Sequence, residues 1–191
     1  MLEQRDDADL LRRYRRGDTE AFGVLYARHR VGLYSFLKGL CSDAQLAEEI
    51  FQETWLSLIR SDSQQQPERA RFRSWLYRIA RNRLIDHWRR QGRAAPLESF
   101  DESVHDQPQG DGEPEAWLQA SQDRERLEQA LQELPEEQRE VFLLRAHAEL
   151  ELAEIAALTQ VPAETVKSRL RYALAKLRRL LAAPLGEEVC R

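Results

Sequence analysis

The chain has 191 residues, of which 32% are charged and 42% hydrophobic, and its mean hydropathy is -0.66. No apolar run approaches the roughly 20 residues of a membrane-spanning helix, and the first residues lack the basic and apolar regions of a secretory signal. We therefore expect a cytoplasmic protein without membrane insertion. Cys41 and Cys190 are too few for a disulfide framework. Scarce glycine with abundant Leu, Ala, Arg, Glu and Gln favours an all-α fold.

The net charge of -4 is the sum of the charges of three segments, one positive and two negative. Residues 1–95 carry a net +5, residues 96–120 carry seven acids and no basic residue, and residues 121–191 carry a net -2. Residues 101–114 combine Pro, Gly and acids, so they cannot bury enough apolar surface to offset their ordering entropy. We predict two small helical domains, residues 1–95 and 117–185, joined by a flexible acidic linker at 96–116 and followed by a tail at 186–191.

Two amphipathic helices are predicted in the first half of the first domain. The first follows Asp18, a plausible N-cap, and carries apolar residues at three- and four-residue steps from Phe22 to Leu40. The second runs to about Leu58 and buries one apolar face. Its other face carries a stripe at the same steps, which is either a solvated surface or a protein-docking surface. The stripe consists of Glu49, Gln52, Glu53 and Leu56.

A third helix is predicted from about Arg71 to Arg90, and it is strongly basic. Between Ala70 and Arg93 there are eight arginines and one acid, Asp86, with aromatic residues interleaved. Arginines neutralise phosphates and exposed aromatic rings stack on unpaired bases, which single-strand binding requires. The alternative is an ordinary solvated face, with aromatics such as Trp75 in the core.

The second domain has the layout of a helix-turn-helix. A helix is predicted to start at Pro135, a short helix covers about 150–158, and a break at 159–161 precedes a long helix from Pro162 to about Leu181. Residues 165–186 contain six basic residues and no acid. The short helix, tight turn and basic amphipathic helix point to DNA binding.

The sequence offers no pattern for catalysis. The four histidines are scattered, no spacing of metal ligands is visible, and phosphate-binding and nucleophile motifs are missing. We expect no enzyme, no cofactor and no metal. Besides a promoter-binding protein, two alternatives are an autonomous DNA-binding regulator and a helical interaction module that binds no DNA. The arginine- and aromatic-rich helix distinguishes the promoter-binding protein from the regulator, because a repressor that binds only duplex DNA does not need such a helix.

Four segments resemble bacterial extracytoplasmic-function (ECF) sigma factors. Residues 47–56 and 72–90 are similar to regions 2.2 to 2.4 of that family, and residues 134–142 and 154–170 are similar to regions 4.1 and 4.2. The resemblance covers nearly the whole chain except the linker. It implies a dissociable promoter-specificity subunit of RNA polymerase that directs transcription initiation and has no catalysis of its own.

The resemblance also assigns roles to residues. It implies that the stripe Glu49, Gln52, Glu53 and Leu56 docks on the clamp coiled coil of the polymerase β′ subunit, and that the factor also contacts the β flap. Residues 63–69 and the basic helix would capture the −10 element as a single strand, through Arg71, Trp75, Tyr77, Arg78, Asn82 and Arg89. The long C-terminal helix would enter the −35 element of promoter DNA, through Thr165, Lys167, Ser168, Arg169, Arg171 and Tyr172.

Three further expectations follow from the resemblance. The linker would thread through the basic nucleic-acid channels of the polymerase, and an anti-sigma factor is a common partner of such proteins. Gln160 replaces the glycine that is frequent in the family's turn, so the resemblance implies that Gln160 adopts a left-handed conformation there. Residues 64–67 have the unusual composition Gln-Gln-Gln-Pro. The base preference of the −10 loop therefore cannot be transferred from the family.

Overall fold

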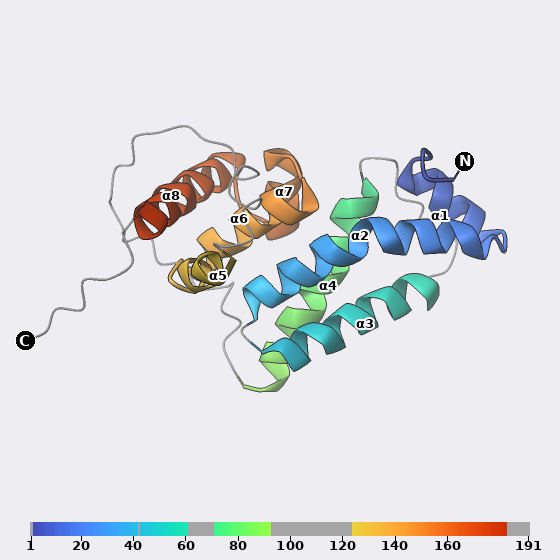
Figure 1. Ribbon diagram of the computed structural model, residues 1–191, viewed down its shortest axis with the longest axis horizontal. Helices are drawn as coiled ribbons and strands as arrows, with labels where there is room; N and C mark the ends of the chain where they lie inside the picture. The colour runs from blue at the N-terminus through green and yellow to red at the C-terminus, as the bar shows by residue number, and fades with distance from the viewer. Residues whose placement is uncertain (1, 42, 61–70, 93–123, 183–191) are drawn as a thin grey trace, which may run out of the picture.

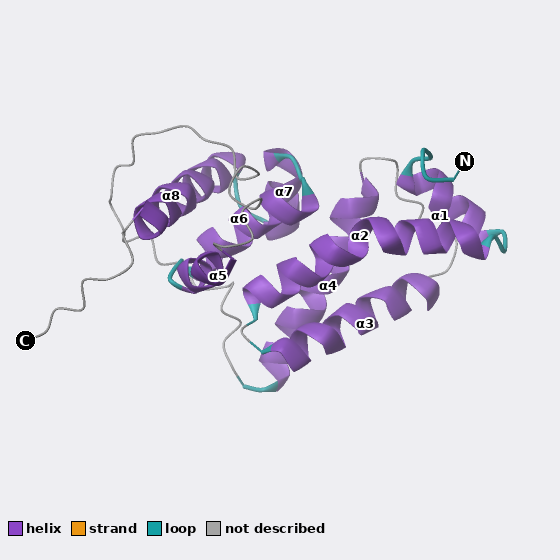
Figure 2. Cartoon of the chain, in the orientation of Figure 1, coloured by secondary structure: helices purple, strands orange, loops and turns teal. Residues whose placement is uncertain are grey.

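The computed structural model describes residues 2–41, 43–60, 71–92 and 124–182, and the regular structure in these ranges is entirely helical (Figure 1 and Figure 2). The expected all-α fold is confirmed. The predicted linker, the loop at 63–69 and the tail lie outside the described residues. In chain order the helices are α1 (Asp7–Arg15), α2 (Thr19–Leu40), α3 (Ala44–Arg60), α4 (Arg71–Arg90), α5 (Arg124–Gln132), α6 (Glu136–Ala148), α7 (Leu152–Thr159) and α8 (Ala163–Ala182).

Aspartate side chains cap the first three helices. The Asp18 carboxylate accepts a hydrogen bond from the amide of Ala21 at 3.3 Å, so the predicted N-cap of α2 is confirmed. Asp6 accepts from Asp9 at 2.8 Å at the start of α1, and Asp43 accepts from Gln45 at 2.8 Å at the start of α3. Each cap satisfies an amide that has no partner within its helix.

Helix α6 begins one residue later than predicted. Pro135 has a ψ of 143°, which is extended, so it is the N-cap and Glu136 is the first helical residue. Helices α1 and α5 were not predicted at all. Each has nine residues, too few turns for a clear apolar period.

A cluster of three polar side chains fixes α1 to α2. His29 Nε2 lies 2.8 Å from Asp7 Oδ2, and Arg28 bonds both Asp7 and the backbone carbonyl of Glu3. Burial raises the pKa of Asp7, but the hydrogen bonds and charges of His29 and Arg28 outweigh it and lower the pKa overall. The buried carboxylate is therefore held in its charged form.

Helix α2 lies at the centre of the molecule and packs on α1, α3 and α6. Leu25, Leu33, Phe36 and Leu37 of α2 are fully buried. Figure 1 shows α1–α4 on one side and α5–α8 on the other. We call these groups the N-terminal half and the C-terminal half. Their buried residues form one continuous hydrophobic cluster, so the two halves pack directly against each other in this structure.

Helices α7 and α8 form the predicted helix-turn-helix. Helix α7 opens with a reciprocal capping box between Glu151 and Glu154, and α8 buries Val166, Leu174 and Leu177 along its apolar face. Between the helices, Gln160 has a φ of 61° and a ψ of 34°. The left-handed conformation expected of Gln160 is confirmed.

We predict that Gln160→Gly stabilises the protein by about 1 kcal/mol, because a side chain in the left-handed region costs roughly 1–2 kcal/mol that glycine avoids. Ala157→Gly, at an exposed position of α7, is the matched control and should lower stability by about 1 kcal/mol. Urea unfolding of the parent and both variants measures the difference. If the two substitutions shift stability in the same direction, strain at Gln160 is refuted.

Candidate functional site

The stripe predicted for protein docking lies on an exposed face of α3. Glu49, Gln52 and Leu56 are exposed, and α3 buries its opposite face in the core as predicted. Glu53 is half-buried because Arg83 of α4 pairs with its carboxylate. Next to the stripe is an open depression of about 500 Å³, lined by Tyr34, Ala44, Gln45, Glu48, Glu49 and Gln52.

Exposed apolar side chains extend this stripe toward the C-terminal end of α3. Leu56 and Ile59 of α3 are 43% and 45% exposed, and Tyr26 of α2 is 36% exposed. The Tyr26 ring packs on Trp55 with a centroid distance of 5.0 Å. The sequence interpretation missed Ile59 and Tyr26. Ile59 follows Gln52 and Leu56 at helical steps of four and three, and that spacing could have found it.

Helix α4 presents only part of its predicted DNA-binding set. Arg78, Asn82 and Arg89 are exposed, and Arg89 lies 4.0 Å from Asp86. Trp75 is buried, with its ring 6.1 Å from that of Phe72. The side chain of Arg71 lies outside the described residues.

Tyr77 is the most deeply buried residue of this predicted set, with 1% of its surface exposed. Its ring packs edge-on against Phe36 at 5.1 Å, and its hydroxyl donates to the His147 carbonyl at 2.9 Å. Burial raises the pKa of Tyr77. In this arrangement Tyr77 cannot offer a ring face to a base.

Helix α8 projects two cations in the same direction. Lys167 and Arg171, one turn apart, are exposed, and the Arg171 guanidinium lies 5.2 Å from the ring centre of Tyr172. Thr165, Ser168, Arg169 and Tyr172 are half-buried. The Ser168 hydroxyl donates to the Thr165 carbonyl at 2.9 Å, so its proton is already used within the helix.

Arg169 lies near an acid of its own half. Glu140 of α6 is almost fully buried. Burial raises the pKa of Glu140, and the positive charges of Arg81 and Arg169 act in the opposite direction. The two arginines come from the two halves of the molecule, α4 and α8. One carboxylate therefore stands between the two predicted DNA-binding helices.

The described residues contain no group of three or more His, Cys, Asp or Glu side chains that could hold a metal ion. Among the helices of the described ranges, none is long and apolar enough to cross a membrane. The candidate binding surfaces among the described residues are therefore the acidic and apolar stripe on α3 and the basic helices α4 and α8.

Comparison with known proteins identifies the class. Residues 25–94 match the family model for Sigma-70 region 2, and residues 130–179 match Sigma-70, region 4. The chain is 32% identical to the ECF RNA polymerase sigma factor RpoE of Cereibacter sphaeroides over 161 residues, which cover 84% of this chain and 86% of the relative. These matches place the basic helix α4 in region 2 and the helix-turn-helix in region 4.

Two solved structures share the fold. The sigma factor RpoE of Bartonella quintana, solved with the anti-sigma factor NepR, superposes with a TM-score of 0.59 at 24% identity, over 84% of this chain and 96% of that one. CnrH, solved with the cytosolic domain of CnrY, superposes with a TM-score of 0.54 at 27% identity, over 92% and 96%. The chain belongs to the ECF sigma factors. It is a promoter-recognising sigma subunit of RNA polymerase.

Cys41, at the end of α2, is buried and chemically protected. Its thiol donates to the Leu37 carbonyl at 3.0 Å, and burial, with a contribution from Asp43, raises its pKa to about 11. Because the thiolate is the nucleophile, only about 0.1% of such thiols are in the reactive form at pH 8.

We predict that the Cys190→Ser variant, which retains Cys41, reacts slowly with a disulfide reagent at pH 8. The rate should rise about tenfold per pH unit between 7 and 9, because the thiolate fraction does. The same variant in denaturant is the control and should react at once. Fast reaction of the native protein would contradict the buried position of Cys41.

Proposed function

We propose that this sigma factor reads two promoter elements with separate surfaces, α4 capturing the −10 element as a single strand and α8 entering the −35 element as a duplex. We propose that α3 docks on the clamp coiled coil of the polymerase β′ subunit and that the C-terminal half contacts the β flap. The observation that carries the proposal is the pair of basic helices, one in each half. The factor would assist strand opening in the cytoplasm without catalytic activity of its own.

The predicted −35 residues of α8 differ in exposure, and the exposed ones are best placed to contact base edges. Lys167 and Arg171 extend into solvent from adjacent turns in the N-terminal part of the helix, where a recognition helix contacts base edges. Arginine can bond both acceptors of a guanine in the major groove. Thr165 and Arg169 suit contacts to phosphates, and half-buried Ser168 and Tyr172 border the same face.

The −10 surface is supported by three exposed polar residues of α4, two of which are arginines. Arg78 and Asn82 lie four residues apart on one face of α4. Arg89 follows on the same face, seven residues or about two helical turns after Asn82. Guanidinium groups at this spacing can follow the phosphates of a single strand, and a base that has left the stack can bind next to them. Trp75 and Tyr77, the aromatic members of the proposed set, are both buried in this structure, so the support comes from the exposed polar residues. Arg71 is the N-terminal cation of the set.

The docking surface on α3 combines charge with apolar area. Glu49 and Gln52 supply polar contacts, and Leu56 together with Ile59 supplies an exposed apolar edge. The buried core of a protein interface is apolar and is surrounded by a polar rim, which is the pattern of this stripe. The alternative of an ordinary solvated face does not explain two large apolar side chains in the same stripe.

We also propose an anti-sigma factor as a partner. Both similar structures were solved as complexes, one with the anti-sigma factor NepR and the other with the cytosolic domain of CnrY. The match covers 96% of each of those sigma chains, which supports a partner of the same kind for this one.

We predict that Lys167→Ala combined with Arg171→Ala weakens −35 recognition by roughly 1–3 kcal/mol for each base that the helix no longer contacts. Run-off transcription with core polymerase, on promoters with intact and scrambled −35 elements, measures the effect. Arg16→Ala combined with Arg30→Ala removes two exposed cations elsewhere and is the control. Unchanged promoter selectivity in the α8 variant would refute the assignment. Tight promoter binding by the parent without polymerase, and no transcript with it, would favour an autonomous regulator.

We predict that Glu49→Lys combined with Leu56→Asp weakens binding to core polymerase at least tenfold, equivalent to about 1.4 kcal/mol. Both positions are exposed, so the helix content in circular dichroism should not change. Glu20→Lys, at an exposed site on α2, is the control for an added positive charge. Fluorescence anisotropy measures the affinity of the double variant and of the control for core polymerase. Parent-like affinity in the double variant would rule out docking through this stripe.

A further inference from the structure

The cations of α8 differ in what their side chains contact. Arg169 is half-buried, and its charge acts on the buried Glu140. Arg171 is exposed, and within the described ranges its side chain makes no hydrogen bond and no ion pair. Its guanidinium instead lies over the ring of Tyr172, 5.2 Å from the ring centre. The charge of Arg171 is therefore not taken up by an acid of the described residues.

The contact between Arg171 and Tyr172 requires a particular direction of the arginine side chain. Adjacent residues of a helix point about 100° apart, so the Arg171 chain has to lean along the helix surface to reach its neighbour's ring. An arginine side chain has many rotamers and loses considerable freedom when it is fixed. Tyr172 is half-buried, and a tyrosine side chain has only two torsion angles to fix. The ring is therefore the more restrained partner, and the guanidinium rests on it.

An aromatic ring restrains a guanidinium without using up its hydrogen bonds. The N–H groups of arginine lie in the plane of the guanidinium, at its edges, whereas the attraction of a cation to an aromatic ring acts through the ring face. A carboxylate, in contrast, accepts those hydrogen bonds and neutralises the charge. Arg171 is therefore restrained while its edge donors stay available for the two acceptors of a guanine.

We propose that Tyr172 is a positioning residue: its ring holds the Arg171 guanidinium at the surface of α8, so that Arg171 reads a guanine of the −35 duplex. This inference rests on the proposed −35 role of α8, and it gives Tyr172 a role through Arg171 instead of a DNA contact of its own. A side chain that is restrained before binding loses less freedom on binding. The ring therefore increases the preference for guanine, because only guanine offers both acceptors to the restrained donors.

A promoter library randomised through the −35 element, transcribed by core polymerase with each variant, measures the base preference. Arg171→Ala identifies the base pair that Arg171 reads. Tyr172→Leu and Tyr172→Met remove the ring, and each should lower the guanine preference at that base pair roughly two- to fivefold, the size of an exposed cation–π contact. Tyr172→Phe keeps the ring face and should retain the parent preference. In the Arg171→Ala background, Tyr172→Leu should change nothing further, because the ring then has no guanidinium to hold.

The outcomes separate this inference from the proposed −35 role. Unchanged base preference in Arg171→Ala overturns the −35 role of Arg171 and the inference together. A loss in Arg171→Ala without one in the ring-less variants overturns the inference alone. An equal loss from Tyr172→Leu in both backgrounds also overturns it, because that result indicates a direct DNA contact or a purely structural role of Tyr172.

Nuclear magnetic resonance of the free chain tests the positioning without DNA. The order parameter of the Arg171 Nε–H bond should fall in Tyr172→Leu and stay at the parent value in Tyr172→Phe. Circular dichroism of both variants checks that the helix content is unchanged. An Arg171 side chain that is equally ordered with and without the ring overturns the positioning role of Tyr172.

Discussion

The arrangement of the two halves depends on a shared hydrophobic cluster, in which α2 packs on α6, and on the buried pair of Arg81 and Glu140, which joins α4 to α6. An ionised side chain with 2% exposure needs a partner, and here the partner comes from the other half of the chain. Because the pair spans α4 and α6, it ties α4, which packs mainly on α3 of its own half, to the C-terminal half as well. Tyr77 of α4 adds a second tie, because its ring packs on Phe36 of α2 and its hydroxyl donates to the His147 carbonyl. The contacts that Arg73, Tyr77 and Arg81 make with the C-terminal half are thus polar, beside a hydrophobic cluster that both halves share.

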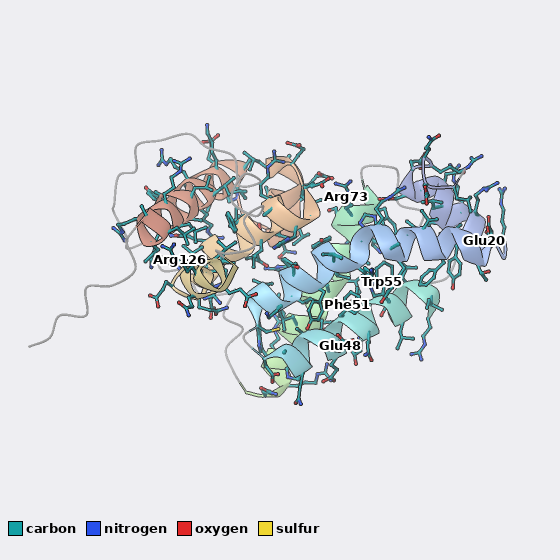
Figure 3. The ribbon with its side chains drawn as sticks, viewed as in Figure 1. Glu20, Glu48, Phe51, Trp55, Arg73 and Arg126 are labelled. Carbon is teal, nitrogen blue, oxygen red and sulfur yellow. The ribbon has the colours of Figure 1, made fainter. Side chains whose placement is uncertain are left out.

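The two faces of the N-terminal half differ in what they can bind while the halves are in contact. The stripe on α3 points away from the C-terminal half, and Figure 3 shows Glu48 of the same helix on that outer side. In contrast, Tyr77 and Arg81 lie under α6 and the α6–α7 segment. A protein partner can reach α3 without any rearrangement, whereas a nucleic acid cannot reach the whole of α4. The fold thus puts the proposed polymerase-docking surface and the proposed −10 surface on different faces of the N-terminal half.

The sequence predicted what depends on neighbours along the chain and missed what depends on distant contacts. Helical periodicity placed Glu49 and Leu56 on the exposed face of α3, and the glycine that the family often has in its turn implied a left-handed Gln160. The same reasoning could not assign Tyr77 to a core position, because its partners Phe36 and His147 lie far away in sequence. Arg81 and Glu140 each appear as ordinary surface charges in a chain that is 32% charged, and only the fold brings them together.

The surroundings of Glu140 also change the interpretation of α8. The family resemblance treats Arg169 as a DNA contact, but its side chain is half-buried and its charge acts on Glu140. A guanidinium attracted by a buried carboxylate has less freedom to follow a phosphate. The proposed base-edge contacts of α8 are therefore better assigned to the exposed Lys167 and Arg171 than to Arg169.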